Sequence, residues 1–306
     1  MLADLPEELL ERILANAVVA KHPADDGAPR IVPLLVCRAF YRIVLPFVYH
    51  NVVLHTLAQS LAVLHTLRAH PALARSVRTL VIRAPGPADA EILRAMARAG
   101  GGLLALDITL PGTCKSGGAE PDAALLDALR ELRSLRDLTV RKGAGTYLSQ
   151  PAPRALLAAL ADAVASCPAL VRPPAPPACL SLLLTPAQKT VALSFPLSAD
   201  PALAPLVAAL AAAPALHTFR TPLPSLWAPP LLAVSANPAL AQICLGDDLP
   251  PRARTRGARD GEWGRRPVLG SSLCLHAARQ HARLCELLLA GTTVIGWRDR
   301  GEYVQA

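Results

Sequence analysis

Apolar positions along most of the chain follow a repeated pattern. Six segments read Leu-x-x-Leu-x-Leu, with other apolar residues in place of some leucines, and their closing positions alternate with the period of a β-strand. The six segments are Val77–Ile82, Leu103–Ile108, Leu135–Val140, Leu216–Phe219, Leu240–Leu245 and Leu284–Leu289. Most follow a stretch with helical spacing, and these stretches are Ala88–Ala99, Pro121–Leu132, Pro153–Ser166, Pro201–Ala213 and Ser272–Ala282. The pattern predicts an α/β chain of repeated helix–strand units.

The units are unevenly spaced. The second leucine-type positions lie at residues 80, 106, 138, 219, 243 and 287, and the step of 81 residues from 138 to 219 leaves room for two more units, near Leu180–Leu184 and Val191–Phe195. Helix–strand units of this length resemble irregular leucine-rich repeats, which stack into a solenoid with parallel strands along one curved surface. The asparagine usual in such repeats is absent, so we expect a distorted solenoid over residues 51–248.

Several segments rich in proline and glycine interrupt these units. They are Pro111–Pro121, Arg141–Pro153, Pro173–Pro177 and an Arg/Gly/Pro-rich loop over residues 249–270. We expect residues 271–306 to form a last helix–strand unit and a C-terminal tail. Within that unit, Leu275–Ala278 and Glu286–Gly291 faintly resemble one ankyrin repeat, but a single such repeat would not be stable.

The N-terminus has a different organisation. A helix is expected to start near Leu5-Pro6, where the acidic Glu7 and Glu8 suit the first helical turn. Its apolar residues lie at helical spacing and are Leu9, Leu10, Ile13 and Leu14. A second apolar helix is predicted from about Ile31 to Val44, ended or kinked by Pro46.

These N-terminal residues resemble an F-box. The first half of the motif reads Leu5-Pro6-x-Glu8-Leu9-Leu10-x-x-Ile13-Leu14, and the second reads Leu35-Val36-Cys37-Arg38-x-Phe40. The match covers about residues 4–50 and predicts a helical module over residues 1–50. Phe40 stands where many family members have tryptophan, and the loop between the halves is longer. The run Leu45-Pro46-x-x-Tyr49-x-x-Val52 also looks like F-box proteins in which repeats follow the module.

The resemblance implies a role as the substrate-receptor subunit of a Skp–cullin–F-box ubiquitin ligase. Such a module docks on a Skp-family adaptor, and through it on a cullin-RING ligase, while the repeats hold a protein target. The implied adaptor contacts are Leu5, Pro6, Leu9, Leu10, Ile13, Leu14, Val36, Cys37 and Phe40. A module this small buries little apolar surface by itself, which is consistent with a partner. The alternative is that these leucines are core residues of a stand-alone interaction scaffold.

Composition and motifs favour a protein-binding function. The formal charge is +8, almost wholly from dispersed arginines, and aromatic residues make up 4% of the chain, so a nucleic-acid partner is the weaker interpretation. The seven cysteines form no CxxC pair, and His281 with Cys285 is better read as a helix surface than as a catalytic or metal site. No phosphate-binding loop or hydrolase motif is present. We therefore expect an intracellular, cytoplasmic or nuclear adaptor without enzyme activity, cofactor, metal or membrane span.

Overall fold

The chain forms an α/β structure around one seven-stranded parallel sheet. The computed structural model describes residues 6–19, 32–99, 103–112, 123–132, 134–143, 145–166, 189–222, 229–245 and 281–294. The strands are β1 (Asn51–Leu54), β2 (Thr79–Ile82), β3 (Ala105–Leu110), β4 (Asp137–Lys142), β5 (Lys189–Leu193), β6 (Leu216–Thr221) and β7 (Gln242–Leu245). They lie side by side in chain order, and every neighbouring pair is parallel.

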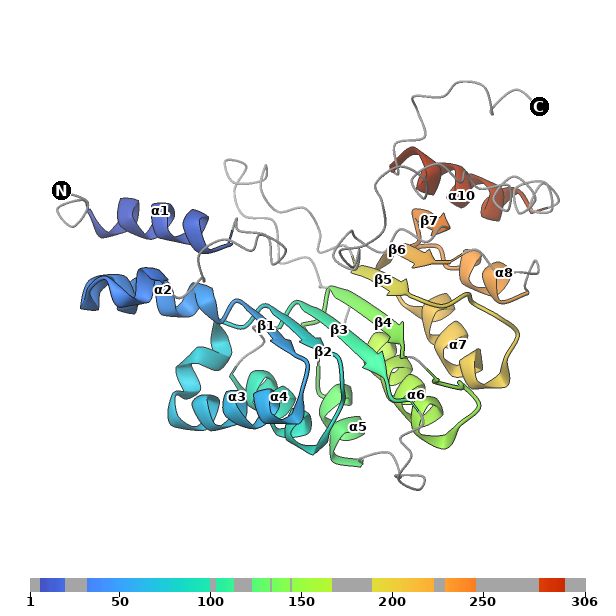
Figure 1. Ribbon diagram of the computed structural model, residues 1–306. Helices are drawn as coiled ribbons and strands as arrows, with labels where there is room; N and C mark the ends of the chain where they lie inside the picture. Colours follow the sequence, from blue (N-terminus) through green and yellow to red (C-terminus); the bar gives the residue numbers. More distant parts are fainter. Residues whose placement is uncertain are drawn as a thin grey trace, which may run out of the picture.

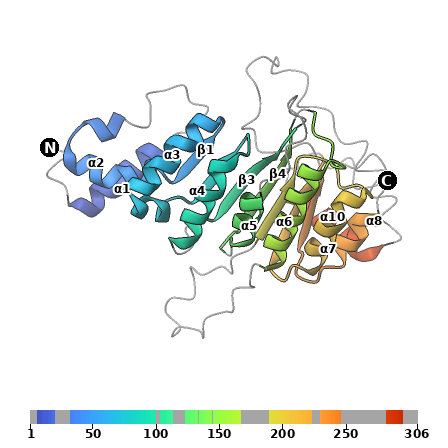
Figure 2. The same cartoon turned by 90° about the horizontal axis from the view of Figure 1, so that it is seen from below.

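The helices between the strands line one face of this sheet (Figures 1 and 2). They are α3 (Leu57–Ala69), α4 (Pro87–Arg98), α5 (Ala123–Arg130), α6 (Pro151–Ser166), α7 (Ala204–Ala212) and α8 (Pro229–Ser235), with the short 3-10 turns η3 (Pro71–Arg75) and η4 (Pro201–Leu203). Each helix packs against the next one in the chain. Parallel strands in sequential order need crossovers of one hand, and this places all the crossover helices on the same side.

Two ladders of apolar side chains join the sheet to these helices. The first ladder is set by the strand register and contains Val52, Leu80, Leu106, Leu138, Val191, Phe219 and Ile243. The second contains Leu54, Ile82, Ile108, Val140 and Leu193. All of these residues belong to the main hydrophobic core. Because side chains alternate along a strand, the residues between them project to the opposite face, which we call the polar sheet face.

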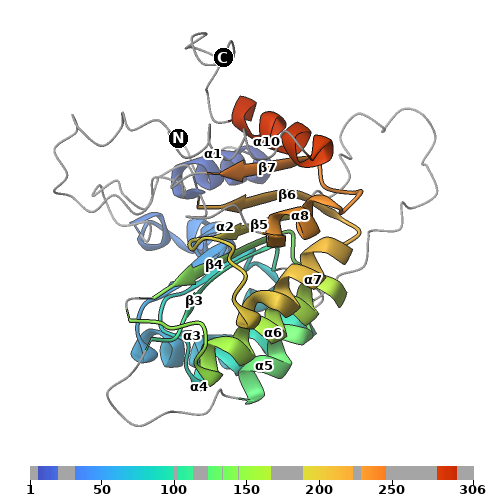
Figure 3. The same cartoon turned by 90° about the vertical axis from the view of Figure 1, so that its right-hand side faces the viewer.

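The helix α10 (Ala282–Val294) covers the end of the sheet beyond β7 (Figure 3). Its buried leucines Leu284, Leu287 and Leu288 extend the main core. The Arg283 guanidinium donates to the carbonyl of Leu240, with an Nη2–O distance of 2.7 Å. At Gly291 the helix backbone lies so close to β7 that a Cβ there would be 2.0 Å from the Ile243 carbonyl oxygen.

The prediction of a strand over Leu284–Leu289 is therefore wrong, because these residues form the middle of α10. The spacing of Leu284, Leu287, Leu288 and Gly291 puts them on one face of a helix, and the same letters also fit Leu-x-x-Leu-x-Leu. The position beside the edge of β7 favours the helix over the strand. A helix carrying this apolar face covers the edge and the core below it.

The two N-terminal helices form a separate small core. The helix α1 (Glu7–Val19) packs on α2 (Arg38–Val48), and the pair lies beyond β1 at the opposite end of the molecule from α10 (Figure 1). Their buried residues are Leu10, Leu14, Val18, Ile43 and Val44. This cluster is distinct from the main core, although Leu45 and Tyr49 at the end of α2 reach the main core.

The second predicted N-terminal helix differs in its bounds. A 3-10 turn, η2 (Val32–Leu35), is followed by a break at Val36 and extended backbone at Cys37, after which α2 begins. The helix then continues through Pro46 to Val48. Proline here removes one backbone hydrogen bond near the end of the helix. The packing of Phe47 and Val48 against the small core stabilises the final turn.

The α/β class and the parallel strands were predicted correctly, and so were most strand positions. Five of the six pattern segments are confirmed as strands β2, β3, β4, β6 and β7, and the unit near Val191 is confirmed as β5. The unit proposed near Leu180–Leu184, most of Ser272–Ala282 and the loop over residues 249–270 lie outside the described residues. Among the described helices, none has both the length and the apolar character needed to cross a bilayer.

Candidate functional surfaces

The first candidate surface is the outer side of α1. The helix begins after Pro6, whose carbonyl accepts hydrogen bonds from the N–H groups of Leu9 and Leu10 at N–O distances of 3.0 and 3.1 Å. Leu9 and Ile13 lie four residues apart on the same side of the helix and are 47% and 46% exposed. They form an apolar pair that α2 does not cover.

The next two predicted contacts, Leu10 and Leu14, have the opposite environment. They are 4% and 6% exposed and pack in the small core against Ile43 and Val44 of α2. They therefore hold α1 on α2 rather than face outward. Outside this core, Arg42 donates a hydrogen bond to Glu7, with an Nη2–Oε2 distance of 2.7 Å between two exposed side chains. Exposed ion pairs add little stability, so the buried leucines fix the helix pair.

The turn before α2 exposes a second apolar group. Leu35 and Val36 are 79% and 61% exposed, and Tyr41 in the first turns of α2 is 50% exposed. Cys37 is exposed and is a free thiol, and its carbonyl accepts from the N–H of Tyr41 at 2.9 Å. Phe40 is half-buried against the small core.

The structure thus divides the nine predicted adaptor contacts into three groups. Exposed residues are Pro6, Leu9, Ile13, Val36 and Cys37, and those within the helix pair are Leu10, Leu14 and the half-buried Phe40. Leu5 lies outside the described residues. Leu35 and Tyr41 were missed as exposed apolar residues. Tyr41 directly follows Phe40 on α2, and successive side chains of a helix point in different directions, so Phe40 packs on the small core while Tyr41 is exposed.

The second candidate surface is the polar sheet face. At its centre Asp107 of β3 pairs with two arginines from the neighbouring strands. Arg83, just after β2, donates from Nη1 to Oδ1 at 3.1 Å. Arg141 of β4 donates from Nε to both carboxylate oxygens, at 2.8 and 3.0 Å. The side chains of Asp107 and Arg141 are 16% and 15% exposed, which marks this cluster as partly desolvated.

A second charged group lies nearer β6 on the same face. Burial raises the pKa of Asp137, while a hydrogen bond from Thr190 and the positive charges of Arg136 and Arg220 lower it. Burial also raises the pKa of the Cys244 thiol, and Arg220 opposes this shift through its charge and a hydrogen bond. Arg220 therefore lies between a carboxylate and a thiol. Neither charged cluster was predicted, because the strand pattern in the sequence concerns only the apolar positions.

No protein-family model matches the sequence, and no curated protein matches it. Among the described residues, no three histidine, cysteine or acidic side chains gather in a way that could hold a metal ion. The function is therefore inferred from the geometry of the two surfaces.

Proposed function

We propose that the chain is an F-box substrate receptor of a Skp–cullin–F-box ubiquitin ligase. In this function the α1–α2 pair docks on a Skp-family adaptor, and the strand–helix units present a protein target. The observation that carries the proposal is the division of α1 into two apolar stripes. Leu10 and Leu14 fill the small core, while Leu9 and Ile13 remain about half exposed.

The sequence motif and the exposed stripe support the same interface. Pro6, Leu9, Ile13 and Val36 belong to the two halves of the F-box pattern, and all four are exposed. Covering the exposed parts of such side chains contributes about 1 kcal/mol each before the entropy cost of association. Several such contacts together are needed for a specific interface, and the α1 stripe and the turn at Leu35 and Val36 provide them.

Co-purification with a Skp-family adaptor tests the proposal. The full chain is expressed with the adaptor, and the double variant Leu9→Asp/Ile13→Asp is compared with wild type. Both residues are half exposed, so the charged side chains are compatible with a folded helix pair. We expect wild type to retain the adaptor and the variant to lose it by at least about tenfold, because a carboxylate cannot be buried in an apolar interface without a partner.

A matched control exists on α3. Leu57 and Leu61 are also four residues apart and are 50% and 52% exposed. They follow the carboxyl end of β1, whereas α2 precedes the amino end of β1. The variant Leu57→Asp/Leu61→Asp should bind the adaptor as wild type does. Failure of folded wild type to bind would remove the link to ubiquitin ligases and would leave a protein-interaction scaffold. Equal loss in both double variants would show that α1 is not the specific contact.

A further inference from the structure

The charged side chains are unevenly distributed over the described part of the chain. The α1–α2 pair carries three acidic and three basic residues, and the helical layer, from α3 to α10 with its connecting turns, carries seven of each. The strands and the residues that directly flank them carry seven cations, Arg78, Arg83, Arg136, Arg141, Lys142, Lys189 and Arg220, and only two carboxylates, Asp107 and Asp137. The whole excess of positive charge in the described residues therefore belongs to the strands and the residues beside them. By alternation along the strands, Arg83, Arg141 and Arg220 lie on the polar sheet face with the two carboxylates, and the other four cations lie at strand ends.

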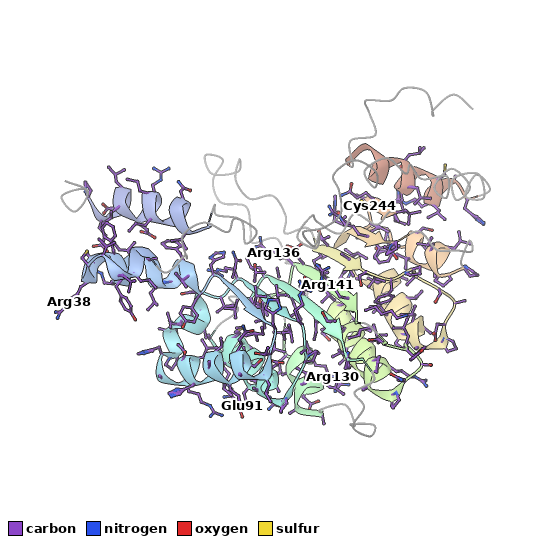
Figure 4. The ribbon with its side chains drawn as sticks, viewed as in Figure 1. Arg38, Glu91, Arg130, Arg136, Arg141 and Cys244 are labelled. Atoms are coloured by element: carbon purple, nitrogen blue, oxygen red, sulfur yellow. The ribbon has the colours of Figure 1, made fainter. Side chains whose placement is uncertain are left out.

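The cations at the centre of the sheet are held in place. Asp107 fixes the guanidinium groups of Arg83 and Arg141 across three adjacent strands, but one carboxylate balances only one of the two charges. In Figure 4, Arg136 and Arg141 lie on the side of the sheet away from α3–α6, whereas Glu91 and Arg130 lie on the helical side. Fixed side chains lose less conformational entropy when they bind a ligand.

Two polar atoms on the strands of the sheet lack hydrogen-bond partners in the part of the chain that the structure describes. Thr109 Oγ1 and Arg220 Nε are buried and have no hydrogen-bond partner among the described residues. Thr109 lies between the strand positions of Arg83 and Arg141, and Arg220 lies further along the sheet on β6. A buried donor without an acceptor costs free energy. Both atoms are covered by protein, so the attraction of the face for carboxylates comes from its guanidinium groups and not from these two atoms.

We propose that the polar sheet face binds an acidic polypeptide segment, and that this segment belongs to the protein target. The role as target-binding surface rests on the proposed function, whereas the binding of acidic peptide rests only on the charge and geometry of the face. The neutral residues between the cations, such as Thr79, Thr139 and Gln242, can hydrogen-bond a peptide backbone. The ligand is thus a chain with carboxylates spaced along it.

A peptide fits this face better than a nucleic acid. Aromatic side chains on which bases stack are missing from the polar positions of the described strands, since Phe219 points into the helical core. Asp107 and Asp137 would also repel a phosphate backbone at the centre of the surface. A peptide can place its carboxylates beside the arginines and its neutral residues beside the two aspartates.

Fluorescence anisotropy with a labelled peptide of repeated Glu-Ser-Gly units, which spaces its carboxylates, tests the proposal on the full chain. The face variant is Arg83→Gln/Arg136→Gln, because Arg83 pairs with Asp107 on the polar sheet face and Figure 4 places Arg136 on the same side of the sheet. The control is Arg75→Gln/Arg154→Gln, at two exposed positions of the helical layer, which makes the same change of net charge. We expect the face variant to lose about tenfold or more in affinity and the control to change less than about twofold, with binding weakened by salt.

Three results would overturn the proposal. They are no binding of the Glu-Ser-Gly peptide by wild type at low salt, equal loss in the two charge variants, and tighter binding of a labelled single-stranded oligonucleotide than of the peptide. The outcome of the adaptor experiment does not depend on the outcome of the peptide experiment. Leu9→Asp/Ile13→Asp should still bind the peptide, and the face variant should still bind the adaptor. Peptide binding without adaptor binding would therefore reject the ligase function and leave the acidic-ligand surface standing.

Discussion

Single residues of the small N-terminal core show what a helical pattern does and does not determine. The spacing of Leu9, Leu10, Ile13 and Leu14 correctly predicted an amphipathic helix. It could not say which pair faces α2, because the two pairs form adjacent stripes of equal hydrophobicity. Only the position of Ile43 and Val44 on α2 selects Leu10 and Leu14 for burial. A prediction from sequence therefore finds the set of candidate contacts but not the exposed half.

Asp89 is a fully buried carboxylate at the start of α4. It accepts a hydrogen bond from the Gly86 N–H at an N–Oδ2 distance of 2.8 Å, and Ser60 packs beside it. Burial raises its pKa, and the hydrogen bonds from Ser60 and Gly86 only partly oppose this shift. The folded state therefore holds the Asp89 proton more tightly than the unfolded state. The stability that this proton contributes is present at acid pH and is lost as the pH rises through the folded pKa.

The variant Asp89→Asn tests this sign. Asparagine stays neutral and still offers an oxygen to the Gly86 N–H, so it avoids the cost of a buried charge at neutral pH. We expect the melting temperature of the variant, relative to wild type, to rise as the pH goes from about 4 to about 7. Thermal unfolding followed by circular dichroism measures the difference. Ser60→Ala removes a hydrogen bond that lowers the pKa of Asp89, so the melting temperature of this variant should fall more steeply with rising pH than that of wild type. If the melting temperatures of Asp89→Asn and wild type change with pH in the same way, the assignment is contradicted.

At the scale of whole elements, the sequence predicted the strands well and some helices poorly. The strands were found because their apolar ladders face one helical layer and alternate with polar residues. The helix α3 was missed because its apolar residues are spread around the helix. The sequence does contain a local signal for the start of α3, because Thr56 and Gln59 form a capping box. Thr56 Oγ1 accepts from the Gln59 N–H, and Gln59 Oε1 accepts from the Thr56 N–H, both at 3.3 Å.

The helix α10 shows how tertiary context decides an ambiguous pattern. It covers the edge of β7 and lies close to the strand backbone at Gly291, where a Cβ would be 2.0 Å from the Ile243 carbonyl oxygen and 3.1 Å from the Cys244 nitrogen. Both atoms belong to the backbone of β7, so the added methyl group has no flexible neighbour to displace. The glycine thus sets the distance between the helix and the strand.

Gly291→Ala should push α10 away from β7. Overpacking of this kind costs about 1–3 kcal/mol, although alanine is the better helix former. We expect a lower melting temperature and faster amide hydrogen exchange in both α10 and β7. Gly86→Ala is the control, because the nearest atom to its Cβ is Leu57 Cδ1 at an ordinary 3.6 Å. If Gly291→Ala is no less stable than Gly86→Ala, the close contact between α10 and the sheet edge is refuted.

At the scale of the molecule, the residues that the structure describes form two hydrophobic cores of unequal size. The main core runs from Val52 to Leu288 through all seven strands, and the small core joins only α1 and α2. Leu45 and Tyr49 at the end of α2 contact the main core, and the domain boundary near residue 50 stays a prediction. The proposed functions divide in the same way, with the adaptor at the small core and the acidic ligand on the sheet. This separation requires that the helix pair can be weakened without loss of the sheet.

The double variant Leu14→Ala/Val44→Ala tests that requirement. Leu14 and Val44 are 6% and 0% exposed in the small core, and removing their side chains should cost that core about 3–6 kcal/mol. Hydrogen exchange measured by mass spectrometry should show lost protection over α1 and α2, with protection in β2–β6 unchanged. Leu138→Ala, in the centre of the main core, should do the reverse and weaken the sheet. Loss of protection in the strands of the double variant would mean that the two cores unfold as one unit. The adaptor and acidic-ligand surfaces would then be coupled through folding, and a variant of one would have to be checked for stability before it is read as a test of binding at the other.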